Sequence, residues 1–381
     1  MESAHPLKPW HAEAEAAVVV YPGDAGGEPR SHERMSQVEA AKRLAAILGY
    51  RFAGSFDPAC RYACPLYYVP NETLVSLTLA QDLGIHGAHD LFGGVVPFPF
   101  IATKTITHPL VARNAARPPG WSNDFSCSVQ DVVLPGYAAF SLQDAIAAGR
   151  LLLEHGEVRL KSANGIGGLG QTVATNRDEL EEQLRLLDVE SGLQDGLVLE
   201  RNLPQINTLS VGQVRVGGLT ATYYGAQRLT RNNRGHTVYG GSDLVVSRGD
   251  FDALLRRDLP EAIRVAIAQA CTYHAAALAC FPGMFASRCN YDIAQGLDHA
   301  GRWYSGVLEQ SWRIGGASGA EIAALEAFQA DPSCEVVRAS TTEVYGADAM
   351  LPPDAVVYFS GIDARVGQLA KYSQLDLHAN P

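Results

Sequence analysis

Apolar residues recur along this chain with two periods, which predict a mixed order of helices and strands. The stretch SHERMSQVEAAKRLAAILG has apolar residues every three to four positions, with Ser31 as a helix N-cap and Gly49 as the stop. It follows AAVVVYPG, a short apolar run typical of a buried strand. From Ser141, FSLQDAIAAGRLLLEHG repeats the helical pattern and leads directly into the strand EVRLK. The pattern therefore predicts an α/β protein.

Glycines interrupt this pattern most densely in VRLKSANGIGGLGQ, where GIGGLG matches the dinucleotide-binding motif G-x-G-x-x-G. In a Rossmann fold such a loop runs straight into a helix. Here QTVAT comes first, with the alternation of a strand, and a helix begins only near Asn176 or Asp178. No Lys-Ser or Lys-Thr pair follows the glycines, so a Walker A loop is disfavoured as well.

The glycine segment is therefore predicted to be a flap between two antiparallel strands. Its missing side chains let backbone N–H groups approach phosphate oxygens closely, and Gly165, Gly167 and Gly168 are the candidate contacts. Lys161 precedes the loop on the strand, where its ammonium would reach the same phosphates.

Further strands follow in the second half of the chain. GLVLERNLPQ is a strand that ends at Glu200, and NTLSVGQVRVGG with LTATYYGAQRLT form a hairpin around Gly217 and Gly218. A long helix begins at Pro260, and its His274 is expected to be a core residue rather than a ligand. The basic loop RLTRNNRGHTVYGG carries Arg231, Arg234 and His236, and it fits a cover over a substrate and a solvated connection equally well.

The segments MFASRCNYDIAQ and RWYSGVLEQSWRI are predicted to form a second hairpin through the turn GLDHAG. With the turn centred between residues 298 and 299, position 290 lies opposite 307 and position 288 opposite 309. One face then carries carboxylates, an amide, a hydroxyl and a guanidinium, a set that suits Mg²⁺ with substrate phosphates. A slip by one residue would move Glu309 to the other face, and a solvated Arg-Glu pair is the alternative. The face comprises Arg288, Asn290, Asp292, Glu309 and Ser311.

Taken together, these motifs resemble the ATP-grasp superfamily, from Ile101 to the segment WRIGGAS. The resemblance implies an α/β fold with an N-terminal α/β domain (1–103), a small lid domain with the glycine flap (104–206) and a larger C-terminal antiparallel-sheet domain (207–381). It also implies a lysine before the lid, a second lysine on the strand entering the flap, a glutamate at the adenine-side hinge and a late E-x-N-x-R hairpin. The matching residues are Lys104 in ATKTITHPL, Lys161 in VRLK, Glu200 in LVLE, and Glu309 with Arg313 in LEQSWR.

Three positions depart from the pattern of that superfamily. The glutamate that often holds the ribose would fall near Asn207, and the asparagine of E-x-N-x-R is Ser311, a shorter ligand. The aspartate of the preceding strand is matched by Asn290 or Asp292, because RCNYDIA admits either register.

The resemblance implies a carboxylate-amine ligase that uses ATP and Mg²⁺ and forms ADP through an acyl phosphate. Arg288 and Arg313 would then stabilise the acyl phosphate or hold the substrate carboxylate, since a guanidinium matches a carboxylate with two hydrogen bonds. The alternative is an ATP-binding protein of the same fold without ligase activity, for which Asn207 and Ser311 are the evidence.

Composition narrows the partners to small molecules. The 381 residues include 41 acidic and 30 basic ones, and the formal charge of -11 disfavours nucleic acid and anionic membranes. Seven cysteines without a CxxC pair are expected to be reduced thiols, and His86 and His89 to be surface residues. No apolar window predicts a signal peptide or a membrane span, so a cytoplasmic protein is expected. A homodimer is compatible with the sequence.

Overall fold

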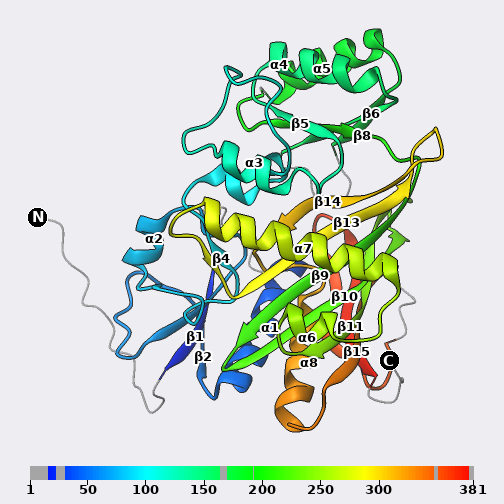
Figure 1. Cartoon of the computed structure of the whole chain (residues 1–381). Coiled ribbons are helices and arrows are strands. Elements are labelled where there is room, and N and C mark those ends of the chain that lie inside the picture. The colour runs from blue at the N-terminus through cyan, green and yellow to red at the C-terminus, as the bar shows by residue number, and fades with distance from the viewer. Residues whose placement is uncertain (1–15, 23–30, 164–169, 192, 347–350, 377–381) are drawn as a thin grey trace, which may run out of the picture.

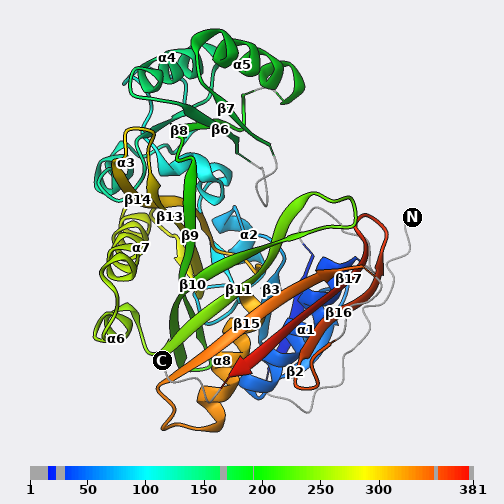
Figure 2. The ribbon, with the colours of Figure 1, turned by 90° about the vertical axis from the view of Figure 1, so that its right-hand side faces the viewer.

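The computed structural model describes residues 16–22, 31–163, 170–191, 193–346 and 351–376. These residues form a three-stranded, a four-stranded and an eight-stranded sheet, with a two-stranded ribbon beside them. The four-stranded sheet and its two helices lie above the large sheet, and the N-terminal sheet lies beside it (Figures 1 and 2). The predicted α/β class is confirmed. The boundaries at residues 103 and 206 stay predictions.

The N-terminal sheet is parallel and has the strand order β2-β1-β3. Its strands are β1 (Ala17–Tyr21), β2 (Arg51–Ser55) and β3 (Leu66–Pro70), and helix α1 (His32–Leu48) connects the first two. The predicted caps are confirmed: the Ser31 side chain accepts a hydrogen bond from the Arg34 backbone N–H, and Gly49 is left-handed with a φ of 68°.

The four-stranded sheet has the order β5-β8-β6-β7, and helices α4 (Leu142–Leu153) and α5 (Arg177–Ser191) belong to it. Its strands are β5 (Gly136–Ala139), β6 (Val158–Ser162), β7 (Gln171–Ala174) and β8 (Leu197–Arg201). Strands β6 and β7 pair antiparallel, from Val158 opposite Ala174 to Lys161 opposite Gln171. The glycine segment therefore joins two antiparallel strands, as predicted, and the Rossmann arrangement is excluded.

The large sheet has the order β14-β13-β9-β10-β11-β15-β17-β16, with all neighbours antiparallel. The turn between β9 and β10 is Gly217-Gly218, and both glycines have the positive φ that a two-residue hairpin turn requires. The strands are β9 (Gln205–Val216), β10 (Leu219–Arg231), β11 (Thr237–Arg248), β13 (Arg288–Leu297), β14 (Trp303–Ser311), β15 (Val336–Tyr345), β16 (Val356–Asp363) and β17 (Gly367–Asp376).

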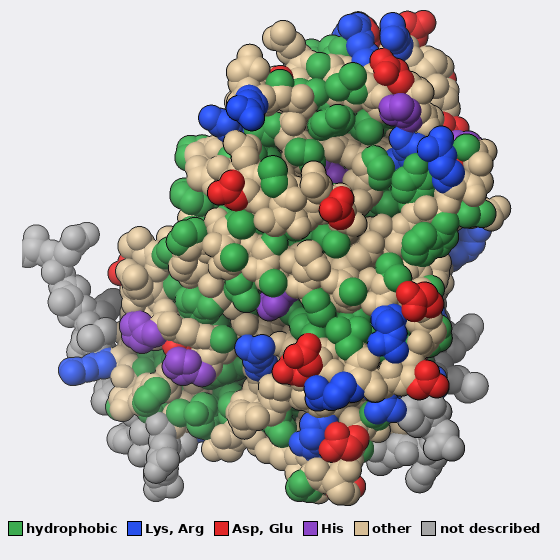
Figure 3. Space-filling model, in the orientation of Figure 1, with side chains coloured by type: hydrophobic (Ala, Val, Ile, Leu, Met, Phe, Trp, Pro, Cys, Tyr) green, Lys and Arg blue, Asp and Glu red, His purple; other side chains and the backbone are tan. Residues whose placement is uncertain are grey.

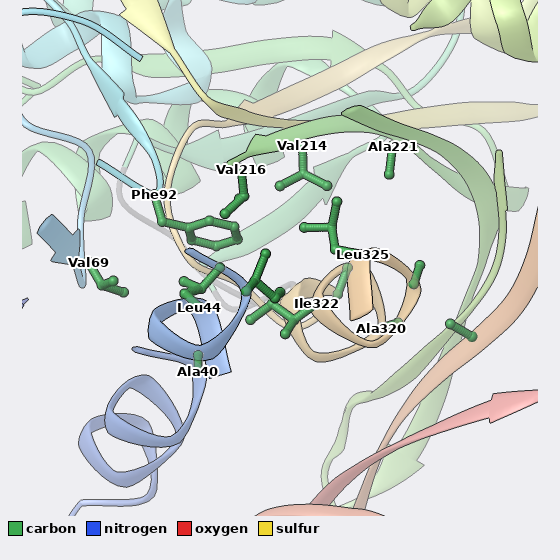
Figure 4. Packing of buried hydrophobic residues seen from close by; sticks show 14 of the residues in the cluster. Ala40, Leu44, Val69, Phe92, Val214, Val216, Ala221, Ala320, Ile322 and Leu325 are labelled. Carbon is green, nitrogen blue, oxygen red and sulfur yellow. The ribbon is translucent and has the colours of Figure 1, made fainter. Parts of the chain in front are cut away.

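Helices cover both faces of the large sheet. Helix α7 (Glu261–Cys280) packs on β13, β14 and β9, whereas α1 and α8 (Ser318–Ala330) pack on the opposite face, as Figure 2 shows. Leu44 of α1, Ile322 and Leu325 of α8, and Val214 and Val216 of β9 meet in one of the two largest hydrophobic cores (Figure 4). Each such side chain stabilises the fold by about 1.5–3 kcal/mol on burial. This face is largely apolar where the helices cover it, with the buried pair of Glu321 on α8 and Arg288 on β13 as an exception.

Short elements link these layers. Two 3-10 helices, η1 (Pro99–Ala102) and η2 (Lys104–Thr107), follow the N-terminal sheet along the chain. Over the face shown in Figure 3, acidic and basic side chains lie interspersed. The remaining elements are α2 (Leu77–Asp82), β4 (Gly94–Val95), α3 (Asn123–Val129), α6 (Phe251–Leu255) and β12 (Phe285–Ala286).

Candidate functional site

The candidate site lies where the four-stranded sheet meets the large sheet. Helix η2 packs against β14 of the large sheet and against β5 and β8 of the small one. It therefore places Lys104 at the joint between the two. The Gln310 side chain donates hydrogen bonds to the backbone carbonyls of Ile101 (2.9 Å) and Thr103 (2.6 Å), and it accepts one from the Tyr273 hydroxyl. These bonds fix the turn that carries Lys104.

One half of the site is a buried ionic cluster on the small sheet, which we call the hinge cluster: Lys161, Glu200 and His108. The Lys161 ammonium lies 2.5 Å from Glu200 Oε1, and His108 Nε2 lies 3.2 Å from Glu200 Oε2. Lys161 is 5% exposed, Glu200 1% and His108 0%. Burial alone would raise the pKa of Glu200, but Lys161 and His108 outweigh burial and hold that pKa at about 2.

The other half is the acidic face of the hairpin β13–β14, which we call the metal face: Asn290, Asp292, Glu309 and Ser311. Asn290 lies opposite Ser311, and Asp292 lies opposite Glu309. The predicted pairing of 290 with 307 and 288 with 309 is therefore wrong. The strands pair as far as Leu297 opposite Trp303, and residues 298–302 form the turn.

A bulge explains why the predicted face survives the wrong register. Near the turn Ile293 pairs with Val307, whereas beyond the bulge Asp292 pairs with Glu309, so Leu308 is an extra residue in β14. If the pairing near the turn continued without the bulge, Glu309 would lie opposite Tyr291 and point to the other face of the sheet. The bulge thus brings both carboxylates to one face.

Donors surround Asp292 on this face. Its Oδ1 accepts hydrogen bonds from Gln227 Nε2 (2.8 Å), Asn290 Nδ2 (2.9 Å) and Ser210 Oγ (3.4 Å). Burial, followed by the nearby charge of Glu309, raises the pKa of Asp292 to about 6 despite the bonds from Gln227 and Asn290. Two carboxylates that face each other beside a single lysine are a local excess of negative charge, which favours a cation.

Lys104 connects the two halves, because its ammonium lies 2.9 Å from Glu309 Oε2. The Lys104 side chain is 6% exposed and that of Glu309 39%. Glu309 is therefore open to solvent on one side while Lys104 approaches it from the joint.

The two arginines that sequence reasoning assigned to substrate lie in different surroundings. Arg288 is 2% exposed and donates to Glu321 (2.8 Å from Nη2), to the backbone carbonyl of Arg313 (2.7 Å) and to Ser311 Oγ (3.3 Å). Its donors are thus engaged by the protein behind the metal face. Arg313 is 32% exposed in its side chain and lies 3.5 Å from Glu72, which follows β3. Of the two arginines, Arg313 is the one that reaches solvent.

Other predicted positions lie apart from this centre. Asn207 is exposed on β9, opposite Gln295 of β13. Gly165, Gly167 and Gly168 lie outside the described residues. The basic loop with Arg231, Arg234 and His236 closes the hairpin β10–β11. Asn233 within it donates to the carbonyls of Val366, before β17, and of Gln368 in β17.

Sequence reasoning missed three residues that the structure brings to the site: His108, Tyr223 and Glu321. Glu321 carried a signal, because it lies among Ala317, Ala320 and Leu325 on the apolar side of a helical pattern, and it is 0% exposed. A buried glutamate requires a partner, and that partner is Arg288. His108 follows Lys104 in an aperiodic segment, where the sequence has no comparable signal.

The metal face fits Mg²⁺ chemically. Two facing carboxylates and neighbouring amide and hydroxyl oxygens are hard ligands, and Mg²⁺ usually takes one or two protein carboxylates together with phosphates and water. Among the described residues, no group of three or more His, Cys, Asp or Glu side chains is arranged as a metal site. The face is therefore suited to a metal that arrives with its substrate rather than to a permanent protein cage.

Solved structures share the fold of this chain. N5-carboxyaminoimidazole synthetase from Staphylococcus aureus, complexed with ADP, is similar with a TM-score of 0.56 at 12% identity over 95% of this chain and 93% of that one. Biotin carboxylase from Campylobacter jejuni gives 0.52 at 10% identity over 96% and 88%. Phosphoribosylamine-glycine ligase from Thermotoga maritima gives 0.51 at 14% identity over 94% and 91%. These are ATP-grasp enzymes, and the fold of this chain is the ATP-grasp fold.

Within that fold, the chain belongs to the family described as "Protein of unknown function (DUF3182)", whose model matches residues 20–373. No curated protein matches the sequence. In the part of the chain that the structure describes, every helix is too short or too polar to span a membrane.

Proposed function

We propose that the protein is an ATP-dependent, ADP-forming ligase that activates a carboxylate as an acyl phosphate for attack by an amine. The observation that carries the proposal is the placement of Lys104. This lysine lies at the joint between the two sheets and reaches Glu309 of the metal face, while Lys161 and Glu200 lie on the small sheet that contacts the same joint. A nucleotide held along this joint would have its phosphates beside two ammonium groups and the metal face.

The residues have separate roles in this proposal. Lys161 and Glu200 bind the nucleotide on the lid side, with Gly165, Gly167 and Gly168 of the flap over the phosphates. Asp292 and Glu309 hold Mg²⁺, with Ser311 as a weak or water-mediated ligand. When bound, Mg²⁺ supplies positive charge that offsets the charge of the phosphates. Little covalent chemistry is required of the protein, since positioning and charge stabilisation account for most of phosphoryl transfer.

The reaction balances with two substrates. A carboxylate oxygen attacks the γ-phosphorus of ATP, the bond to the β,γ-bridging oxygen breaks, and ADP leaves. The amine nitrogen then attacks the acyl carbon, phosphate leaves with the electron pair of the broken C–O bond, and the nitrogen loses a proton. Arg313, the more exposed arginine, binds the carboxylate or the acyl phosphate, and Arg288 acts from behind the metal face. The name of the Thermotoga maritima ligase, which contains an amine and an amino acid, supports this substrate pair.

The second candidate is a nucleotide-binding protein of this fold without ligase activity. Two shortened or exchanged side chains favour it: Ser311 in place of an asparagine, and the exposed Asn207 in place of a glutamate. Cytoplasmic location, small-molecule partners and a homodimer are proposed as well.

The two candidates are separated by measuring ADP release from purified protein with ATP, Mg²⁺ and pools of carboxylates and amines. Hydroxylamine in place of the amine traps an acyl phosphate as a hydroxamate. The ligase proposal predicts ADP and hydroxamate with at least one carboxylate pool, and neither product with Glu309→Gln. ATP binding without either product in any pool contradicts the ligase and supports the second candidate.

A further inference from the structure

A buried hydrogen-bonded chain leads from helix α8 to the metal face. Glu321 Oε1 accepts from Arg288 Nη2 (2.8 Å) and from the Tyr223 hydroxyl (2.5 Å), and Tyr223 also lies 3.0 Å from Asn290 Oδ1. Asn290 Nδ2 donates to Asp292 Oδ1 at 2.9 Å. Glu321 and Tyr223 are both 0% exposed, so the bond between these two side chains is closed to water.

This series of hydrogen-bonded side chains has too few donor protons for its acceptors. Tyr223 has one hydroxyl proton and faces two acceptors, Glu321 and Asn290. A tyrosine hydroxyl keeps its proton at neutral pH, so that single proton stays on the phenol. The shorter distance and the ionised, Arg288-paired acceptor direct it to Glu321. The carboxamide oxygen of Asn290 is then left facing the tyrosine oxygen.

A carboxamide that turns by 180° resolves this conflict. Its Nδ2 then donates to the Tyr223 oxygen, which is free to accept, and its Oδ1 faces Asp292. Asp292 Oδ1 keeps two other donors, Gln227 and Ser210. The turned carboxamide places its oxygen beside a carboxylate oxygen of Asp292, and the two oxygens repel each other. A cation bound to both oxygens makes the same arrangement favourable.

We propose that Tyr223 and Glu321 are positioning residues that turn the Asn290 carboxamide, so that its oxygen joins Asp292 in binding the divalent cation. The inference rests on the proposed function. The sequence left open whether Asn290 or Asp292 matches the aspartate of the ATP-grasp pattern. The inference gives both residues a role: Asp292 binds the cation directly, and Asn290 joins it once its carboxamide has turned. Glu321 acts by accepting the hydrogen bond of the tyrosine hydroxyl, and Arg288 acts by holding the Glu321 carboxylate in place. Neither Tyr223 nor Glu321 touches the cation or the substrates.

The test uses Tyr223→Phe and, as a matched control, Tyr291→Phe. Tyr291 is also 0% exposed and lies on β13 next to Asn290, but its hydroxyl bonds His274 (2.7 Å) and Trp312 (3.3 Å). Mn²⁺ is titrated into full-length protein saturated with ADP, and free Mn²⁺ is counted by electron paramagnetic resonance. Tyr223→Phe is expected to weaken Mn²⁺ binding by about 10–100-fold, the usual effect of losing a residue that orients a metal ligand. Tyr291→Phe is expected to leave it unchanged.

A double-mutant cycle shows whether the effect passes through Asn290. In an Asn290→Ala background, Tyr223→Phe is expected to cause no further loss of Mn²⁺ affinity, because no carboxamide remains to orient. Glu321→Gln is expected to weaken Mn²⁺ binding as well, since its amide donates to Tyr223 and sends the tyrosine proton back to Asn290. Unchanged affinity in Tyr223→Phe, an equal loss in Tyr291→Phe, or additive losses in the cycle overturn the inference. Failure of the wild-type protein to bind ADP instead contradicts the proposed function.

Discussion

The hinge cluster and the metal face both combine carboxylates with basic side chains, but in opposite proportions. In the hinge cluster one carboxylate, Glu200, meets a lysine and a histidine, and all three side chains are buried. On the metal face two carboxylates, Asp292 and Glu309, meet one lysine, and Glu309 is 39% exposed. The pKa values follow: that of Glu200 is held at about 2, and that of Asp292 is raised to about 6.

This difference separates a self-contained ionic cluster from one that requires a further cation. The hinge cluster is neutralised by the protein and is expected to hold its geometry without ligands. The metal face has an excess of negative charge that the protein leaves in place, at a cost in stability. The predictions below run from the largest expected effect to the smallest, and those on the two clusters test this contrast.

Glu309→Gln should have the largest effect, and it should act on activity alone. We expect at least about a 10²–10³-fold loss of Mg²⁺-dependent ADP formation, the scale found when a charge-stabilising group is removed. The amide oxygen still accepts from Lys104, and the side chain is partly exposed, so the melting temperature should hardly change. Steady-state ADP assays and thermal unfolding measure the two effects. An active Glu309→Gln protein would remove the metal assignment.

Lys161→Met should act mainly on stability, in contrast to Lys104→Met. Lys161→Met leaves Glu200 buried without its ammonium, which should lower the free energy of unfolding by about 3–5 kcal/mol. Lys104→Met leaves Glu309 facing solvent and should cost under about 1 kcal/mol. Urea unfolding of both variants gives the comparison. Equal losses in the free energy of unfolding would show that the two clusters do not differ in how far the protein neutralises their charge.

Both lysine variants should also bind ATP more weakly, and isothermal titration checks this. If Lys161→Met altered NADH binding rather than ATP binding, the nucleotide assignment itself would be wrong.

The local pattern of the sequence predicted the helices and strands on either side of the glycine segment, because caps and periodicity are local properties. Ser31, Gly49 and the strand QTVAT behave as their patterns indicate, and the order of two strands around the glycine segment sufficed to exclude a Rossmann loop. The register of β13–β14 was not predictable. It depends on a bulge at Leu308, and bulges follow from tertiary packing and not from residue type.

The site shows the same division between local and long-range information. Lys104, Lys161, Glu200 and Glu309 follow recognisable motifs, and the structure pairs them two by two. Their partners come from distant segments: Glu321 from α8 reaches Arg288, and His108 reaches Glu200 across 92 positions. Such pairings require the fold, although a glutamate on an apolar helix face already indicates that a buried partner exists.

The two carboxylates should make stability depend on pH in opposite directions. The Glu200 pKa in the fold, about 2, lies below its ordinary 4.5, so its stabilisation is complete above pH 4.5 and is lost as pH falls toward 2. The Asp292 pKa, about 6, lies above its ordinary 3.8, so its contribution is complete below pH 3.8 and is lost as pH rises through 6.

Urea unfolding at a series of pH values tests both signs, with Glu200→Gln and Asp292→Asn as the matched variants. The difference between wild type and Glu200→Gln should change only below pH 4.5, by roughly 3 kcal/mol in all. The difference between wild type and Asp292→Asn should change mainly between pH 4 and 6, and saturating Mg²⁺ with ADP should flatten it. If both differences in unfolding free energy changed with pH in the same direction, the contrast between the two clusters would be contradicted.

Asn207→Ala should have the smallest effect, because this residue belongs to neither cluster. Asn207 is exposed on β9, and one solvent-accessible hydrogen bond to a ribose is worth about 1 kcal/mol, or roughly fivefold in affinity. We expect the KM for ATP to rise by no more than that factor, with kcat unchanged. Asn207→Glu, which restores the glutamate implied by the ATP-grasp pattern, should lower the KM if the sugar lies there. If neither variant changes the KM, the ribose is held elsewhere, and binding of the nucleotide depends on the hinge cluster and the flap.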